Sequence, residues 1–374
     1  MRFTDVAGQT AAKKALIQMW QGGRMPHALL LLGREGTGGL ALALAFAQYV
    51  LCERKEDADS CGLCANCQKT QRLEHADLHL SFPSFRPKPE KPAKSSNFIR
   101  EFREFVRETP YGTTFDWLQF IHAENKQGNI SADECRDIID QLNFKSYEGG
   151  RKIQVMWRPE YLGKEGNILL KLIEEPPADT LILFVAEASE DILATILSRT
   201  QLVRLTPIHA ADIAAALVAK GLADPRKAAQ IGQIADGSFT EAIRLLLHLE
   251  NDLLPAVRNW FNSIFTNNGI GLVQFSEEWA KAGREGIRNL MAYTLTLLEG
   301  ALRTAYLPDG AASFAPEEAQ FVRKLATRGL PVEVMKRMIE ALTDAAYHIE
   351  RNAHSKSVLL ACSISLRKLV QTGR

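Results

Sequence analysis

Apolar residues in the N-terminal part of the chain alternate between helical spacing and short continuous runs. Positions 8–20 carry apolar residues at helical spacing, and positions 28–32 form a continuous apolar run. Short continuous runs of this kind are typical of strands that are buried on both faces. We therefore predict a helix over 8–20, a buried strand over 28–32 and a strongly apolar helix over 40–51.

The same alternation resumes at Ile130. Ser131 and Glu134 have the spacing of a capping box, which predicts that a helix begins there. The predicted elements are a helix over 131–142, a strand over 152–157, a helix over 169–177 and a strand over 180–185. Alternating strands and helices favour a parallel α/β sheet. After Pro207 the pattern is helical almost to the C-terminus.

Residues 81–129 do not follow this alternation. Four prolines and four basic residues fall within 81–94, a composition that disfavours a helix or a central strand. Positions 97–108 return to an amphipathic helical pattern. We interpret about 81–129 as an insertion in the α/β scaffold; its basic stretch is either a solvated linker or an arm that contacts phosphate.

Length and charge limit the classes of protein. The 374 residues predict two or three domains, and Lys plus Arg (45) nearly balance Asp plus Glu (44). That balance argues against a protein that mainly grips nucleic acid non-specifically. The chain contains no run of 18 apolar residues and no signal-peptide pattern at its N-terminus, so we expect no membrane span and a cytoplasmic location.

Four of the six cysteines are clustered. The cluster consists of Cys52, Cys61, Cys64 and Cys67. In a cytosolic chain such clustering favours metal over disulfides, and four thiolates match the tetrahedral preference of Zn²⁺ with no open position. The sequence therefore predicts a structural zinc module at about 52–67. Cys135 and Cys362 are expected to be ordinary buried residues.

A glycine-rich turn joins the predicted strand 28–32 to the helix 40–51. Its glycines are Gly33, Gly36, Gly38 and Gly39. A working P-loop continues its glycine frame with Lys, which reaches the phosphates, and then Ser or Thr, which holds Mg²⁺. Those two places are Gly39 and Leu40, so we expect a degenerate loop that binds no nucleotide cofactor.

Two further stretches have the pattern of nucleotide-site motifs. The strand 152–157 is typical of a Walker B strand, but Trp157 and Arg158 stand where an Asp-Glu pair is expected. Ser198 and Arg199 follow an apolar helix. An arginine at the edge of such a domain can reach a neighbour's γ-phosphate; the alternative is a surface arginine in a salt bridge.

Together these motifs resemble the clamp-loader branch of the AAA+ proteins, the bacterial DNA polymerase III subunits of the γ/τ and δ′ types. The resemblance rests on Phe3-x-Asp5-Val6-x-Gly8-Gln9, on 26–30, the four cysteines, 77–79, 169–177, 195–199 and Gly237-Ser238. It spans most of residues 1–250. It implies an AAA+ (P-loop NTPase-like) α/β domain, a small helical lid and an all-α collar.

The departures from the ATP-hydrolysing pattern resemble the δ′ type. Besides the loop and the Walker B pair, Thr240 replaces the lid arginine of γ/τ-type subunits. The resemblance therefore implies a subunit without ATPase activity of its own, which lends Arg199, beside Ser198, in trans to a neighbouring site. It implies γ/τ-type ATPase and δ-type subunits as partners, with the sliding clamp and primer-template DNA reached through the complex.

The expected domains are an AAA+-like α/β domain over 1–207, a helical lid over 208–248 and a helical collar for oligomerisation over 249–374. An ordinary bundle that buries its own faces is the alternative for the last part. Two other functions stay open at this point. One is a divergent ATPase that still binds nucleotide, and the other is a zinc-containing nucleic-acid-binding module on the same scaffold.

Overall fold

The computed structural model describes residues 1–23, 25–87, 92–123, 128–148, 150–250, 253–307, 314, 316–350 and 353–372. The chain divides into two compact units, Met1–Ala242 and Ile243–Arg374. The finer division at residue 207 stays a prediction.

The first unit is built around a five-stranded sheet in which every pairing is parallel. Its strands are β1 (Ala28–Leu32), β2 (Leu78–Ser81), β3 (Lys152–Trp157), β4 (Thr180–Ala186) and β5 (Gln201–Arg204). They lie in the order β2-β3-β4-β1-β5. The predicted parallel α/β class is confirmed, and the strands predicted at 28–32, 152–157 and 180–185 are β1, β3 and β4. Strands β2 and β5 were not predicted.

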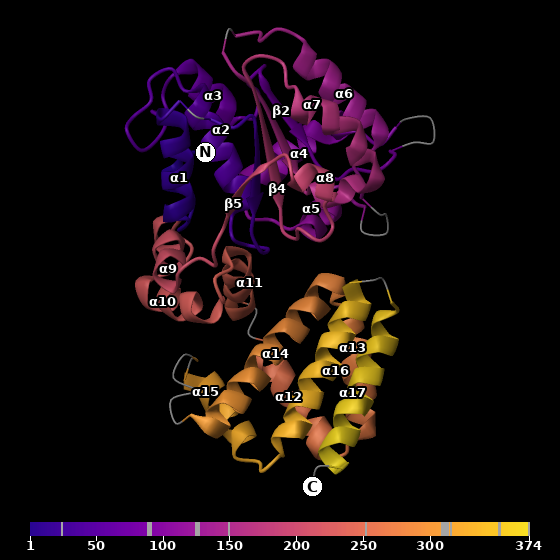
Figure 1. Ribbon diagram of the computed structural model, residues 1–374. Helices are drawn as coiled ribbons and strands as arrows, with labels where there is room; N and C mark the ends of the chain where they lie inside the picture. The colour runs from indigo at the N-terminus through magenta and orange to yellow at the C-terminus, as the bar shows by residue number, and fades with distance from the viewer. Residues whose placement is uncertain are drawn as a thin grey trace. The chain divides into compact units, whose positions relative to one another are not determined.

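Helices cover both faces of this sheet (Figure 1). The helices that precede β5 are α1 (Thr10–Gln21), α2 (Gly39–Leu51), α3 (Ala65–Gln71), α4 (Ile99–Glu108), α5 (Thr114–Phe120), α6 (Ala132–Asn143), α7 (Leu170–Glu174) and α8 (Ala194–Leu197). Short 3-10 helices lie at Phe3–Asp5, Ser95–Phe98 and Pro159–Leu169. Leu30 and Phe184 point into a core shared with α6 and α7, and α2 contacts β1, β3 and β4.

The capping box predicted at Ser131 is only half formed. The Ser131 hydroxyl accepts a hydrogen bond from the Glu134 backbone N–H at 3.3 Å, so α6 begins where predicted. The Glu134 carboxylate turns inward instead and accepts from the Ser81 hydroxyl at 2.7 Å and the Ser95 N–H at 2.8 Å. The glutamate therefore joins β2 and the insertion to α6, although burial raises its pKa.

The insertion is folded rather than a simple linker. Phe82 stacks on Phe102 with ring centroids 3.8 Å apart, and Trp117 meets both rings edge-on. The Trp117 indole N–H donates to the Pro83 carbonyl at 2.7 Å. The composition of 81–94 predicts a loop or linker, which is wrong at Ser81, because that residue ends β2; part of the basic stretch, residues 88–91, lies outside the described residues.

The rest of the chain is helical, as predicted. Helices α9 (Ala210–Ala219), α10 (Pro225–Ile234) and α11 (Phe239–Glu250) follow β5. The second unit contains α12 (Leu254–Phe265), α13 (Gly269–Ala280), α14 (Gly283–Tyr306), α15 (Pro316–Ala326), α16 (Val332–Glu350) and α17 (Ser355–Thr372). These helices bury their own apolar core, in which the Trp260 N–H donates to the Ser363 hydroxyl at 2.9 Å. Among the described residues, no helix is both long and apolar enough to cross a membrane.

Candidate functional site

The glycine loop, residues 33–39, lies at the carboxyl edge of the sheet between β1 and α2. The Gly33 N–H donates to the Ala186 carbonyl at 3.1 Å, which ties the start of the loop to β4. Gly36 and Gly38 have positive φ angles of 78° and 86°. Residues that carry a Cβ atom rarely have such φ angles. The loop therefore keeps a backbone conformation that glycine permits and that is found in phosphate-binding loops.

Side chains pack directly against two glycines of this loop. A Cβ atom on Gly38 would lie 2.6 Å from Cε1 of Tyr111, and one on Gly36 would lie 1.9 Å from the Ser238 hydroxyl oxygen. The cavity that remains above the loop measures about 30 Å³. Ligand pockets usually measure roughly 300–1,000 Å³, so this cavity is much smaller than a typical ligand pocket.

The two positions that lack the P-loop residues are themselves packed. Helix α2 begins at Gly39, where an added Cβ would lie 2.9 Å from Cγ1 of Val185. Leu40 is buried, with 5% of its surface exposed. A side chain at position 39 would therefore require Val185 to move, whereas Thr at position 40 would replace a larger buried apolar side chain.

Trp157 and Arg158 stand where a Walker B strand would carry its acid pair. The tryptophan packs in the core, and the arginine lies beside two carboxylates. Trp157 is buried, with its ring centroid 5.7 Å from that of Phe102 in the insertion, so it is part of the core. Arg158 forms an ion pair with Glu187 and lies 3.7 Å from a Glu160 oxygen. Burial raises the pKa of Glu160, against the opposing effect of the Arg158 charge. Both carboxylates lie beside the Arg158 guanidinium, so little of its positive charge is left to attract a phosphate.

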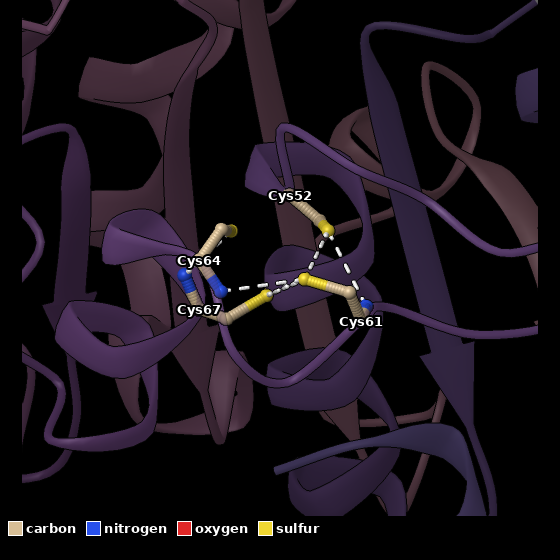
Figure 2. Close-up of side chains that lie close together, drawn as sticks. All are labelled: Cys52, Cys61, Cys64 and Cys67. Atoms are coloured by element: carbon tan, nitrogen blue, oxygen red, sulfur yellow. Dashed lines mark hydrogen bonds between the residues drawn. The ribbon is translucent and has the colours of Figure 1, made fainter.

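The four clustered cysteines lie together at the end of α2 and the start of α3 (Figure 2). Their sulfur atoms all lie within 4.8 Å of one another. Cys61 Sγ is 3.6 Å from Cys52 Sγ and 3.9 Å from Cys67 Sγ. Four thiolates around Zn²⁺, with Zn–S bonds of about 2.3 Å, have sulfurs about 3.8 Å apart. The cluster can therefore hold a tetrahedral metal ion.

Backbone N–H groups surround these sulfurs as they do at metal–thiolate sites. The N–H groups of Leu63 and Cys64 donate to Cys61 Sγ at 3.5 and 3.4 Å. These contacts lower the pKa of Cys61 to about 6, which favours the thiolate that binds metal. Burial has the opposite effect on the pKa of Cys67.

The cysteine loop also holds the start of the chain. Asp59, inside the loop, accepts hydrogen bonds from the backbone N–H groups of Phe3 at 2.9 Å and Thr4 at 3.0 Å. Loss of the loop's structure would therefore remove two of the hydrogen bonds that hold the N-terminal segment.

Ser198 and Arg199 lie at the end of α8, immediately before β5. The Arg199 guanidinium pairs with the Glu174 carboxylate at 2.5 Å, and Nη1 donates to the Ser198 hydroxyl at 3.1 Å. The Arg199 side chain is 35% exposed and that of Glu174 is 46% exposed. An exposed pair of this kind contributes about 0–1 kcal/mol, so Arg199 can exchange Glu174 for another anion at little cost.

Sequence reasoning missed Tyr111, which closes the glycine loop. The structure brings the glycines, Trp157 and Arg158 to one edge of the sheet together with Tyr111, Ser238 and Thr240. No motif marks Tyr111; the only available signal was an aromatic-rich insertion together with Trp157 at the acid position.

Comparisons with known proteins give the family. The family model described as "DNA polymerase III, delta subunit" matches residues 8–209. The chain is 28% identical over 195 residues to the DNA polymerase III subunit delta' of Escherichia coli (strain K12), covering 51% of this chain and 46% of the relative. It is 24% identical over 270 residues to the delta' subunit of Bacillus subtilis (strain 168), covering 72% of this chain and 64% of the relative.

Two further matches are a tau subunit and a gamma-related protein. The tau subunit of Salmonella typhimurium is 25% identical over 249 residues, covering 65% of this chain and 32% of the relative. The solved structure of a DNA polymerase III gamma subunit-related protein from Thermotoga maritima covers 96% of this chain and 99% of its own, at 16% identity and a TM-score of 0.41, too low to establish a shared fold. The matched part spans about half of the first relative's length. Because the family model covers more than half of this chain, the chain belongs to the DNA polymerase III delta-subunit family.

Proposed function

We propose that this chain is a delta-prime-type subunit of a DNA polymerase III clamp loader, which hydrolyses no ATP itself and lends Arg199 to the ATP site of a neighbouring subunit. The observation that supports this proposal is a difference between two places in the first unit, the glycine loop and Arg199. Side chains pack against the chain's own glycine loop, whereas the Arg199 guanidinium is partly exposed and is held by an ion pair with Glu174 and by hydrogen bonds to residues of its own short helix end.

Arg199 suits this role chemically. A planar guanidinium can pair with two phosphate oxygens at once, and it opposes the negative charge that spreads over a transferring phosphoryl group. Supplied in trans, such an arginine typically changes the rate of hydrolysis by about 10³–10⁵, or roughly 4–7 kcal/mol of barrier. The Glu174 pair, about 0–1 kcal/mol, is weak beside that effect. Glu174 therefore holds the arginine in position without preventing its use.

The remaining parts of the proposal are structural. The cysteine cluster binds one Zn²⁺, which stabilises residues 52–67 and the N-terminal segment that Asp59 holds. Helices after residue 249 form the collar through which the subunit joins γ/τ-type and δ-type partners. The sliding clamp and primer-template DNA are reached through that complex.

Reconstitution tests this function. The chain is mixed with the γ/τ-type and δ-type subunits of the same organism, and assembly is followed by size-exclusion chromatography. Loading of the sliding clamp onto primed DNA is then measured with and without the chain. We expect a stable complex and loading that depends on the chain. Full loading without it would contradict the proposal, and Mg²⁺-dependent ATP binding at low micromolar concentration by the chain alone would favour a divergent ATPase.

A further inference from the structure

The insertion places one side chain, Tyr111, against three separate parts of the first unit. Tyr111 lies in a tight turn between α4 and α5, closed by the Gly112 N–H donating to the Thr109 carbonyl at 2.8 Å. A capping box of Thr113 and Asp116 starts α5 directly after the turn. The position of the tyrosine is therefore set by the helices on either side of it.

Tyr111 contacts the N-terminal segment, the glycine loop and α11. Its hydroxyl oxygen accepts a hydrogen bond from the Ala7 N–H at 2.7 Å, and its ring covers Gly38. The Thr240 hydroxyl donates to the Tyr111 carbonyl at 2.5 Å, and the Phe239 ring lies 4.6 Å from the Tyr111 ring, centroid to centroid. Burial raises the pKa of the Tyr111 phenol to about 12, so the group stays uncharged at neutral pH.

Residues that replace nucleotide-site residues contact the insertion. Trp157, in the place of the Walker B acid, packs against Phe102 and Phe105 of α4. Thr240, in the place of the lid arginine, bonds to Tyr111. Trp157 and Thr240 therefore do more than remove nucleotide-site residues, because both contact the same insertion.

From these contacts we infer that the insertion is an internal substitute for the nucleotide. Tyr111 lies above the glycine loop and holds the start of α11 against that loop, as a ligand bound between the two would. The backbone supports the same junction, because the Phe239 N–H donates to the Gly36 carbonyl at 2.9 Å. This inference gives the described part of the insertion a task and does not depend on the proposed partners.

Hydrogen exchange of the full-length chain, read by mass spectrometry, tests the inference. Tyr111→Ala removes the ring and its hydroxyl together. We expect exchange to become faster by about tenfold or more, both in the segment that contains Ala7 and at the start of α11, because buried contacts and a hydrogen bond are lost. Tyr147→Ala, at an exposed tyrosine, is the matched control and should leave both segments unchanged.

Two conservative variants keep the test informative if Tyr111→Ala fails to fold. Tyr111→Phe removes only the bond to Ala7 and should speed exchange in that segment alone. Thr240→Val removes only the hydroxyl and should speed exchange at the start of α11 alone. Wild-type exchange at the start of α11 in both Tyr111→Ala and Thr240→Val would overturn the inference. Protection of α11 by Mg²⁺-ATP in the wild-type chain would also overturn it, because a displaceable side chain is not a substitute for the nucleotide.

Discussion

Restoring Lys at position 39 and Thr at position 40 should destabilise the chain and should not create an ATP site. The clearance at Gly39 is the first reason. An added Cβ would lie 2.9 Å from Val185, and overpacking of this kind typically costs about 1–3 kcal/mol. At Leu40 the change removes a buried apolar side chain and buries a hydroxyl, for about 2–4 kcal/mol more.

The expected loss of about 3–7 kcal/mol is measurable by thermal unfolding. For a domain of this size, each kcal/mol shifts Tm by roughly 2–4 °C, so the double variant should melt roughly 6–28 °C lower. Gly39→Ala isolates the steric part of this loss. Gly150→Ala is its matched control, because a Cβ there meets no atom within 4 Å.

Calorimetry with Mg²⁺-ATP then tests the binding. The double variant should show no heat of binding at micromolar nucleotide, since Tyr111 still lies above the loop and the cavity measures only about 30 Å³. The contrary result is a Kd in the low micromolar range, about −7 to −8 kcal/mol, in a variant that melts like the wild type. It would refute both the clash at position 39 and the claim that Tyr111 blocks the loop.

Three further predictions concern the rest of the first unit. Cys61→Ser should lower bound zinc, read by metal analysis, to well below the wild-type level and reduce Tm, whereas Cys135→Ser should leave the zinc content unchanged. Trp157→Ala should cost about 3–5 kcal/mol in urea unfolding, because its ring anchors the insertion; a loss below about 1 kcal/mol would show that the insertion is held elsewhere. Glu174→Gln should change the free energy of unfolding by less than about 1 kcal/mol. In the assembled loader it should shift ATP hydrolysis far less than loss of Arg199 does.

The strands that could be predicted are those buried on both faces. Strand β1 is continuously apolar and β3 and β4 are mostly apolar, because helices cover both sides of the sheet and bury nearly all of their residues. Strand β5 was missed because three of its four residues are exposed at an edge, and β2 was missed because it has only four residues. Short edge strands lack the apolar pattern that identifies a strand.

The site was predictable only where spacing encodes the chemistry. Four cysteines in a short segment indicate a metal site from the sequence alone, and glycines between a strand and a helix indicate the loop. Tyr111 was not predictable, because its partners Ala7 and Thr240 are more than a hundred positions away on either side. Contacts at that separation follow from the folded insertion and leave no local pattern.

The central claim is that Arg199 acts in trans, and ATP hydrolysis by the reconstituted loader tests it most directly. Loaders that carry wild-type, Arg199→Ala or Arg199→Lys chains are compared in the presence of clamp and primed DNA. Arg136→Ala is the control, since Arg136 is an exposed arginine that pairs with Asp133 at 2.8 Å. We predict that both Arg199 variants assemble normally and lose about 10³-fold or more of the rate at the adjacent ATP site. Hydrolysis at the wild-type rate in the Arg199→Ala loader would contradict the account and leave Arg199 as a surface arginine paired with Glu174.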